Sequence, residues 1–239
     1  SLCFTDADGT AVTLRVLQGS VSVVMAGRDI LQTSRKGVTY VVGQDLLMES
    51  VELVDSTART TVVITARGGA DGVTTLGRLT GDQPANAFVA PGVDLVGQGV
   101  AMGGQGCFNT IRLRDLAAGA AIRMDGQAAG RGITITARNL QGDNAVQAAS
   151  PIALLKAAAW PGGSLTAPCA ANVQTTGDRR LDLRGDFGAA VTLTGQDAGG
   201  RSLAALQIAG AATGLTIDAA GGVNMVSAKQ WNGGSLRAR

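Results

Sequence analysis

Three aspartates spaced four residues apart are the side chains of this sequence that most suggest chemistry. Asp178, Asp182 and Asp186 surround the motif Leu181-Asp182-Leu183. Paired carboxylates carry out acid–base chemistry on glycosidic bonds, and residues four apart on a strand share one face. Three arginines lie in the same stretch, and a neighbouring guanidinium favours the ionised carboxylate over the acid form that such catalysis needs. The set therefore favours a solvated surface of ion pairs, with an active site as the alternative.

A carbohydrate site is a further interpretation of the same stretch. Sugar recognition uses exposed aromatic rings beside paired acids, and the chain has only two tryptophans, four phenylalanines and one tyrosine. Trp160 and Trp231 are the rings that we expect to be available. This alternative carbohydrate site consists of Asp178, Asp182, Asp186, Trp160 and Trp231.

Histidine is absent from the chain, which excludes every mechanism that needs an imidazole. Ser-His-Asp triads, Cys-His dyads and His-ligated metals belong to that group. The three cysteines, Cys3, Cys107 and Cys169, lack the CxxC spacing of a zinc site. In an oxidising compartment Cys107 and Cys169 are the pair that we expect to form a disulfide, whereas in a reducing compartment all three are small apolar residues.

Three segments rich in glycine or aspartate resemble ligand-binding loops without completing one. Residues 5–10 have the Asp-x-Asp-Gly pattern of a calcium loop but lack a bidentate acid at the right spacing. Residues 68–72 resemble one copy of a calcium-binding nonapeptide, which needs stacked neighbours. Residues 97–106 are crowded with glycine, but a strand and not a helix is predicted to follow, so a dinucleotide fingerprint is incomplete. We therefore predict turns in the first two segments, and no catalytic residue, cofactor or metal.

The charge balance limits the partners. The chain has 20 basic and 18 acidic residues, a formal net charge of +2, and its basic clusters are interleaved with aspartates. Nucleic-acid binding needs a basic stripe, and a membrane span needs a longer apolar stretch than any in this sequence. We predict no nucleic-acid partner and no membrane span. Self-association, other structural subunits and carbohydrate stay as candidate partners.

The composition indicates a chain of many short strands. It contains 16 Asp but 2 Glu, and 17 Arg but 3 Lys. Glu and Lys favour helices, whereas Asp competes with the helix backbone and favours turns. The 35 glycines supply backbone freedom for many turns. Many turns imply many short elements, so the fold class that we predict is all-β.

Short aliphatic triplets begin to repeat near residue 108. Ile111-Arg112-Leu113, Ile122-Arg123-Met124 and Ile133-Thr134-Ile135 follow at intervals of 11 residues, and similar triplets recur up to Val223-Asn224-Met225. On a strand each triplet directs two aliphatic side chains to one face. Two such units make a coil of about 22 residues, which is within the range of solenoid repeats. Stacked coils bury the apolar faces of their neighbours, so we predict a β-solenoid, with a β-sandwich as the alternative.

The chain divides into three parts on this interpretation. Residues 1–80 are a smaller β-rich region that docks or caps, residues 81–107 are a Gly-rich connection, and residues 108–239 are the solenoid-like region. One short helix is predicted at about 151–160 within that region. Ser150 is a good N-cap, Pro151 suits the first helical position, and Pro161 followed by two glycines ends the segment.

Residues 108–228 resemble the parallel β-helix proteins of bacterial surfaces, secreted adhesins and phage fibres. The resemblance covers half of the chain and lies in the architecture. Similar folds carry pectin-cleaving enzymes that use Asp-Asp and Gly-His-Gly motifs, or a calcium-binding Asp with a catalytic Arg or Lys. This chain has Asn109-Thr110-Ile111 and no histidine, so no catalytic residue is carried over from them.

We expect a non-enzymatic structural or adhesive subunit of an extracellular assembly, such as a cell surface, a filament or a virion fibre or shell. A stack of strands leaves backbone donors and acceptors open at each end, and pairing these ends gives an oligomer. The expected location is extracellular or at the cell surface, with a virion as the alternative. The alternative function is a carbohydrate-binding or polysaccharide-cleaving β-helix protein.

Overall fold

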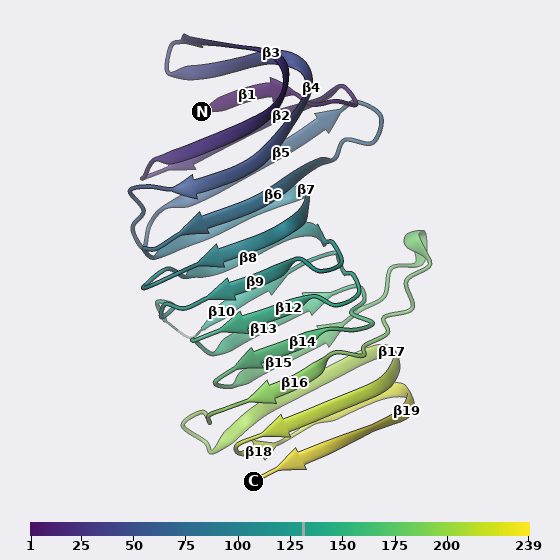
Figure 1. Ribbon diagram of the computed structural model, residues 1–239. Coiled ribbons are helices and arrows are strands. Elements are labelled where there is room, and N and C mark those ends of the chain that lie inside the picture. Colours follow the sequence, from purple (N-terminus) through teal and green to yellow (C-terminus); the bar gives the residue numbers. More distant parts are fainter. Residues whose placement is uncertain (131) are drawn as a thin grey trace.

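The computed structural model describes residues 1–130 and 132–239, and it is an all-β solenoid (Figure 1). Strands account for 67% of the chain and helical turns for 1%, and the chain winds through about eight turns. The predicted all-β class and the predicted stacking of coils are therefore confirmed. A β-sandwich is not formed.

The strands join in one continuous sheet that winds around a single core. In chain order they are β1 (Leu2–Thr5), β2 (Thr10–Leu17), β3 (Val21–Arg35), β4 (Val38–Leu53), β5 (Thr61–Gly68), β6 (Thr74–Gly81), β7 (Ala85–Met102), β8 (Phe108–Leu116), β9 (Ala121–Met124), β10 (Ile133–Thr136), β11 (Asn139–Leu140), β12 (Ala145–Ala148), β13 (Ile152–Ala157), β14 (Ser164–Ala167), β15 (Ala170–Thr175), β16 (Ala190–Leu193), β17 (Arg201–Ala219), β18 (Gly222–Val223) and β19 (Val226–Ala238). One 3-10 turn, η1 (Arg179–Leu181), is the helical element of the described residues.

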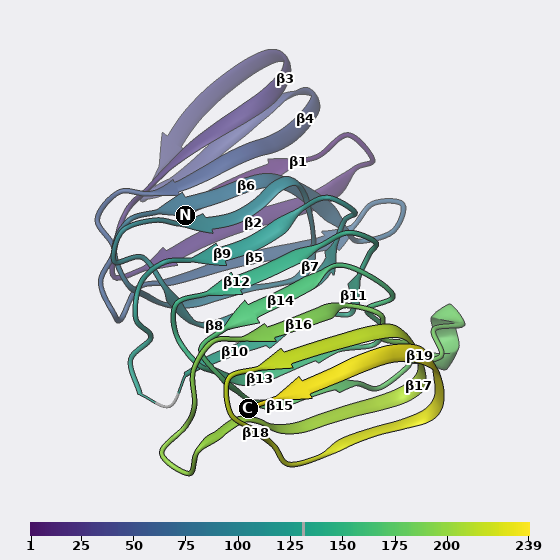
Figure 2. The ribbon, with the colours of Figure 1, turned by 60° about the horizontal axis from the view of Figure 1, so that its bottom comes forward.

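Two broad faces build the stack, and Figure 2 shows the two rows of strands. The long strands β7 and β17 belong to both faces, with their first halves on face 1 and their second halves on face 2. The other strands of face 1 are β2, β5, β8, β10, β13 and β15. The other strands of face 2 are β6, β9, β12, β14 and β16. The triplets of the sequence alternate between these faces. Ile111 pairs with Ile135 on face 1, and Ile122 pairs with Val146 on face 2. The prediction that two triplet units make one coil is therefore confirmed, but each coil here is 24 residues long, the separation of Ile135 from Ile111 and of Val146 from Ile122, and not 22.

A short third side closes each coil with a column of apolar side chains. The neighbours in this column are Leu76, Leu95, Leu116, Leu140, Trp160, Phe187, Ala212 and Trp231. The first six side chains of this column, from Leu76 to Phe187, are each at most 1% exposed. The Trp160 and Phe187 rings meet edge to face, with centroids 5.5 Å apart. Stacking of like positions thus gives the solenoid a dry core despite the few aromatic residues.

The helix predicted at 151–160 is wrong, because this segment forms β13 on face 1. Ile152 and Leu155 both point inward, and the register of β13 with β10 shifts at Ala153, which marks a bulge. This bulge produces the three-residue apolar spacing that resembles a helix in the sequence. Two neighbouring strands supply ladder hydrogen bonds and apolar contacts, and these outweigh the weak intrinsic preference of the segment for helix.

Residues 81–107 form part of the stack and do not connect two separate regions. Strand β7 runs through them and pairs with β6 on one side and with β8 and β9 on the other. The glycines serve tight corners. Gly99 has φ +75°, and a Cβ at this position would lie 2.2 Å from the carbonyl oxygen of Ala121. Close approach between coils therefore explains the glycine at this position.

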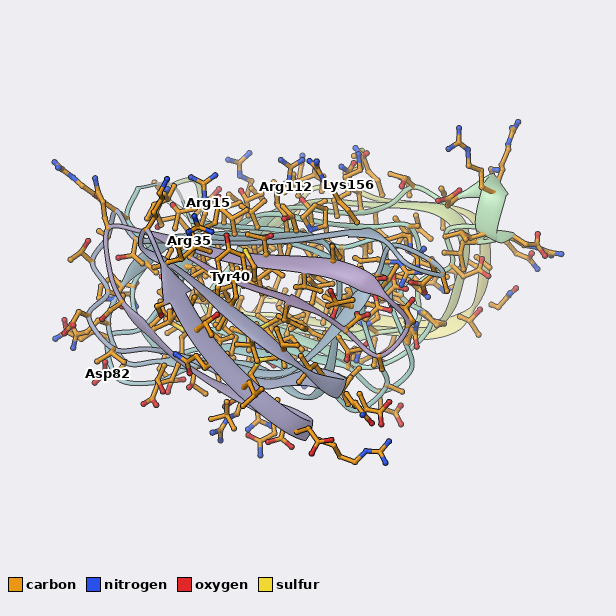
Figure 3. The ribbon with its side chains drawn as sticks, turned by 90° about the horizontal axis from the view of Figure 1, so that it is seen from above. Arg15, Arg35, Tyr40, Asp82, Arg112 and Lys156 are labelled. Atoms are coloured by element: carbon orange, nitrogen blue, oxygen red, sulfur yellow. The ribbon has the colours of Figure 1, made fainter. Side chains whose placement is uncertain are left out.

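The N-terminal end of the core is covered by the hairpin of β3 and β4. Lys36 and Gly37 both have positive φ, as a two-residue hairpin turn of type I′ requires. The outer half of this hairpin pairs with β1 and bends across the end of the stack, as Figure 3 shows from above. Phe4 of β1 and Val41 of β4 itself are buried. The hairpin therefore lies over the N-terminal end of the stack.

Candidate functional site

The residues between β15 and β16 form a loop that protrudes from the stack. The loop spans residues 176–188 and lies at the right of Figure 1, between the strands of successive coils. Leu181-Asp182-Leu183 was predicted to be a strand, and that prediction is wrong. The segment contains η1, and Asp182 has a left-handed backbone with φ 53°. Within the described residues no neighbouring coil pairs with η1, so the triplet adopts a turn in place of a strand.

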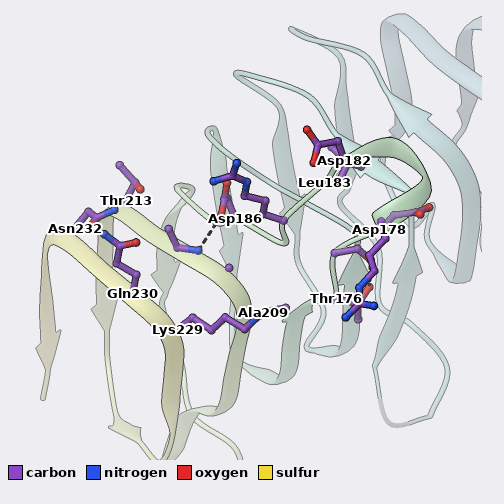
Figure 4. Close-up of a pocket in the computed structure, with 15 residues that line it drawn as sticks. Thr176, Asp178, Asp182, Leu183, Asp186, Ala209, Thr213, Lys229, Gln230 and Asn232 are labelled. Atoms are coloured by element: carbon purple, nitrogen blue, oxygen red, sulfur yellow. Dashed lines mark hydrogen bonds between the residues drawn. The ribbon is translucent and has the colours of Figure 1, made fainter.

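A cavity of about 760 Å³ lies between this loop and the last coils. Loop residues line one side, and residues of β17 and β19 line the other, as Figure 4 shows. Its lining brings together the three predicted aspartates, Asp178, Asp182 and Asp186. These carboxylates come together through the fold of a loop, and not through a shared strand face as the sequence suggested.

Two of the three carboxylates hold the loop in place. Asp178 accepts a hydrogen bond from the Arg180 backbone N–H at 2.9 Å and thereby caps η1. Asp186 accepts one from the Ala211 N–H at 2.8 Å, which ties the loop to β17. Asp182 is exposed and is the acid of the set that remains available to a ligand. The predicted acids therefore serve mainly structural roles.

The opposite wall of the cavity supplies cationic and amide groups that sequence reasoning missed. Lys229, Gln230 and Asn232 of β19 line it, and Gln230 donates to Asn232 at 2.8 Å. These residues lie more than 40 positions from the aspartates in the chain. Only the stacking of β19 on β17 brings them to the cavity. Donors and acceptors of this kind can bind the hydroxyl groups of a sugar.

The two tryptophans of the predicted carbohydrate site are not brought together with its acids. Trp160 is 0% exposed within the third-side column, so it cannot meet a ligand. Trp231 is 45% exposed, but it occupies the same inward column in the last coil. The site with two aromatic rings is therefore not formed.

The disulfide considered between Cys107 and Cys169 is absent, and both cysteines are free and buried. Each precedes the first residue of a face 1 strand, β8 or β15, and β10 and β13 lie between those two strands. Three strand spacings separate them, about 14 Å at ~4.8 Å each. A disulfide needs Cα atoms within about 7 Å. Burial raises the pKa of the Cys107 thiol to about 11.

A polar corner between β7 and β10 was also missed by the sequence analysis. Asp94 and Asp115 are neighbours across one coil, and Arg114 binds Asp94 at 2.7 Å while Arg138 binds Asp115. Burial raises the pKa of Asp94, and the charge of Asp115 acts in the same direction. Asp94 and Asp115 are separated in the sequence by about one coil, and this spacing between two aspartates could have identified the corner. Its ion pairs link residues of neighbouring coils.

Face 1 carries a column of cationic residues that lie far apart in the chain. Arg15, Arg112 and Lys156 occupy one outward column, with three aliphatic or threonine residues between them. Figure 3 shows these side chains on the same side of the molecule. None of the ion pairs within the described part of the chain involves these three side chains. This column gives face 1 a positive potential.

Two further findings concern metals and membranes. Within residues 1–130 and 132–239, no group of three or more Cys, Asp or Glu side chains could hold a metal ion. The same residues contain no helix of the length and apolarity that crossing a membrane requires.

Comparison with other proteins gives no family for the chain. No protein-family model, no curated protein and no solved structure matches it.

Proposed function

We propose that this chain is a non-enzymatic structural or adhesive subunit of an extracellular assembly, and that it associates with a second copy of itself through the β3–β4 cap. The proposed location is extracellular or at the cell surface, with a virion as the alternative. The observation that carries the proposal is the apolar outer surface of the cap. Terminal elements of solenoids normally present a polar outer surface, which keeps them soluble.

The outer surface of the cap exposes three large side chains. Leu31 is 69% exposed, Val42 is 63% exposed and Tyr40 is 44% exposed. Leu31 and Val42 lie directly opposite each other in the hairpin, and Tyr40 is two residues from Val42 on the same side. The three side chains therefore form one patch, which a second copy would remove from water. Burial of each Leu or Val side chain contributes about 1.5–3 kcal/mol.

The backbone of β3 supports the same interface. Strand β3 pairs with β4 alone among the described strands, so its other edge has free N–H and C=O groups. An exposed edge strand beside an apolar patch favours pairing with another strand. Two β3 edges related by a two-fold axis would pair with each other and bring both patches together.

Removal of the patch tests this function. Leu31→Asp combined with Val42→Asp is expected to weaken self-association at least about 100-fold, because the loss of two buried side chains corresponds to roughly 3 kcal/mol. Size-exclusion chromatography with light scattering over a range of protein concentrations measures the change.

The matched control is Leu181→Asp, which alters an exposed leucine of the protruding loop. This variant should associate as the wild-type chain does. A wild-type chain that stays monomeric at every concentration would exclude the proposed interface, and so would unchanged association of the double variant.

Carbohydrate binding is a second candidate, favoured by the polar cavity beside η1. Asp182, Lys229 and Asn232 offer it an acceptor, a cation and an amide on opposite walls. We expect Asp182→Asn to weaken binding of a glycan about tenfold, since one charged hydrogen bond is worth about 1.5–3 kcal/mol. Glycan-array binding followed by calorimetry measures this.

Asp197→Asn is the control for the carbohydrate test, because Asp197 lies in another exposed turn and pairs with Arg201. It should leave glycan affinity unchanged. Equal affinity of Asp182→Asn and wild type for the same glycan would remove the cavity as the site.

A further inference from the structure

An outward column on face 1 carries charge that neither the cap nor the loop cavity uses. This cationic column has one residue from each strand of the face, and backbone pairing fixes their order as Arg15, Val63, Val89, Arg112, Thr136, Lys156, Gln174 and Gln207. Arg112 and Lys156 each lie between two residues that are at most 5% exposed, so both side chains point away from the core. The column therefore runs as one continuous line along the outside of the stack.

The protein does not neutralise the three cations of the column. Within residues 1–130 and 132–239, no ion pair includes Arg15, Arg112 or Lys156. Among the described strands of face 1 the one acid is Asp115, which is 4% exposed and is bound by Arg138. The three positive charges therefore lie on a face that offers them no exposed carboxylate.

Face 2 provides the comparison. One of its outward columns contains Glu52, Arg123, Asp218 and Arg237 in that order, so acids and bases alternate along it. Opposite charges in one column cancel at a distance, whereas charges of one sign add. Figure 3 shows the labelled cations of face 1 along one side of the molecule, with Asp82 on another side. The field of the stack is therefore positive over face 1 and balanced over this column of face 2.

The spacing of the cations fits a linear chain of negative charges. Three strand spacings separate Arg15 from Arg112, and two separate Arg112 from Lys156. At ~4.8 Å for each spacing these separations are about 14 Å and about 10 Å. An extended sugar unit of a linear polysaccharide is about as long as one strand spacing. A glycan lying along the column therefore presents one unit to each strand, and its first, fourth and sixth units meet cations.

The other residues of the column distinguish a glycan from other polyanions. Thr136, Gln174 and Gln207 supply hydroxyl and amide groups that can bind sugar hydroxyls. Single-stranded nucleic acid binds to aromatic side chains on which its bases stack, and the eight residues of the column include no aromatic ring. Anionic membranes attract tight clusters of Lys and Arg, whereas these cations lie at least two strands apart.

We propose that face 1 binds a linear acidic polysaccharide, which runs along the stack and places acidic groups on Arg15, Arg112 and Lys156. This partner goes beyond the proposed self-association, because the cationic column shares no residue with the apolar patch of the cap. It also shares none with the lining of the loop cavity. Single ion pairs at exposed sites are weak, so the affinity depends on how many cations one glycan reaches.

Glycan length tests the match between sugar units and strands. The probes are size-fractionated alginate oligomers, in which every unit carries a carboxylate, titrated calorimetrically into the whole chain at low salt. Three units reach Arg112 and Lys156, and six units also reach Arg15. The step from three to six units should raise the affinity roughly twofold to fivefold, the contribution of one exposed ion pair. Arg15→Gln should remove this gain and leave the affinity for three units unchanged.

A double variant tests the other two cations. Arg112→Gln combined with Lys156→Gln should lower the affinity for six units roughly 3- to 20-fold, because two exposed ion pairs are lost. The slope of log K against log salt concentration should change from about −2 to about −0.7, as expected for three contacts and for one. The matched control is Arg78→Gln combined with Arg123→Gln, which removes the same charge from exposed positions of face 2. This control should keep the wild-type affinity and slope.

Three results would overturn the proposal. One is that six-unit alginate does not bind to the wild-type chain at low salt. Another is an equal loss of affinity in the two double variants, which would assign binding to net charge. The third is tighter binding of poly(dT) or of phosphatidylserine vesicles than of six-unit alginate, which would make face 1 a surface for another polyanion. The cap variant with Leu31→Asp and Val42→Asp, and Asp182→Asn, should both bind alginate as the wild type does, so failure of the cap interface or the loop cavity stays distinguishable.

Discussion

Replacement of Trp160 by alanine is expected to lower the free energy of unfolding by about 3–5 kcal/mol. Trp160 is fully buried, and its ring meets that of Phe187 edge to face. Neighbours in the column above and below are held by backbone pairing, so they cannot collapse into the space that the ring leaves. The indole N–H has no hydrogen-bond partner in the core, so removing this buried donor offsets a small part of the lost unfolding free energy. Urea unfolding followed by far-ultraviolet circular dichroism measures the change.

Trp231→Ala is the matched control, because Trp231 continues the same column in the last coil and is 45% exposed. Its loss should cost less than about 1 kcal/mol. Equal destabilisation by the two substitutions would show that burial in the column does not set their contribution. A small effect at Trp160 would contradict the position that the structure gives it.

The stacked part of the fold could be predicted from the sequence because its physics is local and periodic. Ile111, Ile122 and Ile135 lie on alternating faces of successive coils, and each is buried by the residue one coil away. A period that persists over several coils leaves few alternative arrangements. The helix at 151–160 could not be excluded in this way, because a bulge at Ala153 changes the spacing of the inward residues.

The candidate sites were predictable only in part. The three aspartates of the loop are close in the sequence, so their clustering was visible, but Lys229 and Asn232 reach the cavity through the stacking of a later coil. The register between distant strands depends on every insertion between them, and the repeat alone does not fix those insertions.

Replacement of Ala157 by glutamate distinguishes β13 from a helix over the same residues. In β13, Ala157 is 1% exposed and points into the core beside Thr175 of β15. A glutamate there would overpack the core and bury an unpaired charge, so we expect a loss of at least about 4 kcal/mol in the free energy of unfolding. In a helix whose apolar stripe contains Ile152 and Leu155, position 157 would face away and glutamate would be harmless.

The pH dependence of the Ala157→Glu variant sharpens this test. Burial raises the pKa of an unpaired carboxyl, so the folded variant would bind a proton more tightly than its unfolded chain. Its stability relative to wild type should therefore increase as the pH falls through that raised pKa. Lys156→Glu places the same side chain one residue earlier on the outer surface of β13 and should change stability by less than about 1 kcal/mol. Similar stabilities of the two variants in urea unfolding at neutral pH would contradict the alternation of β13, and with it the register that aligns the coils on both sides.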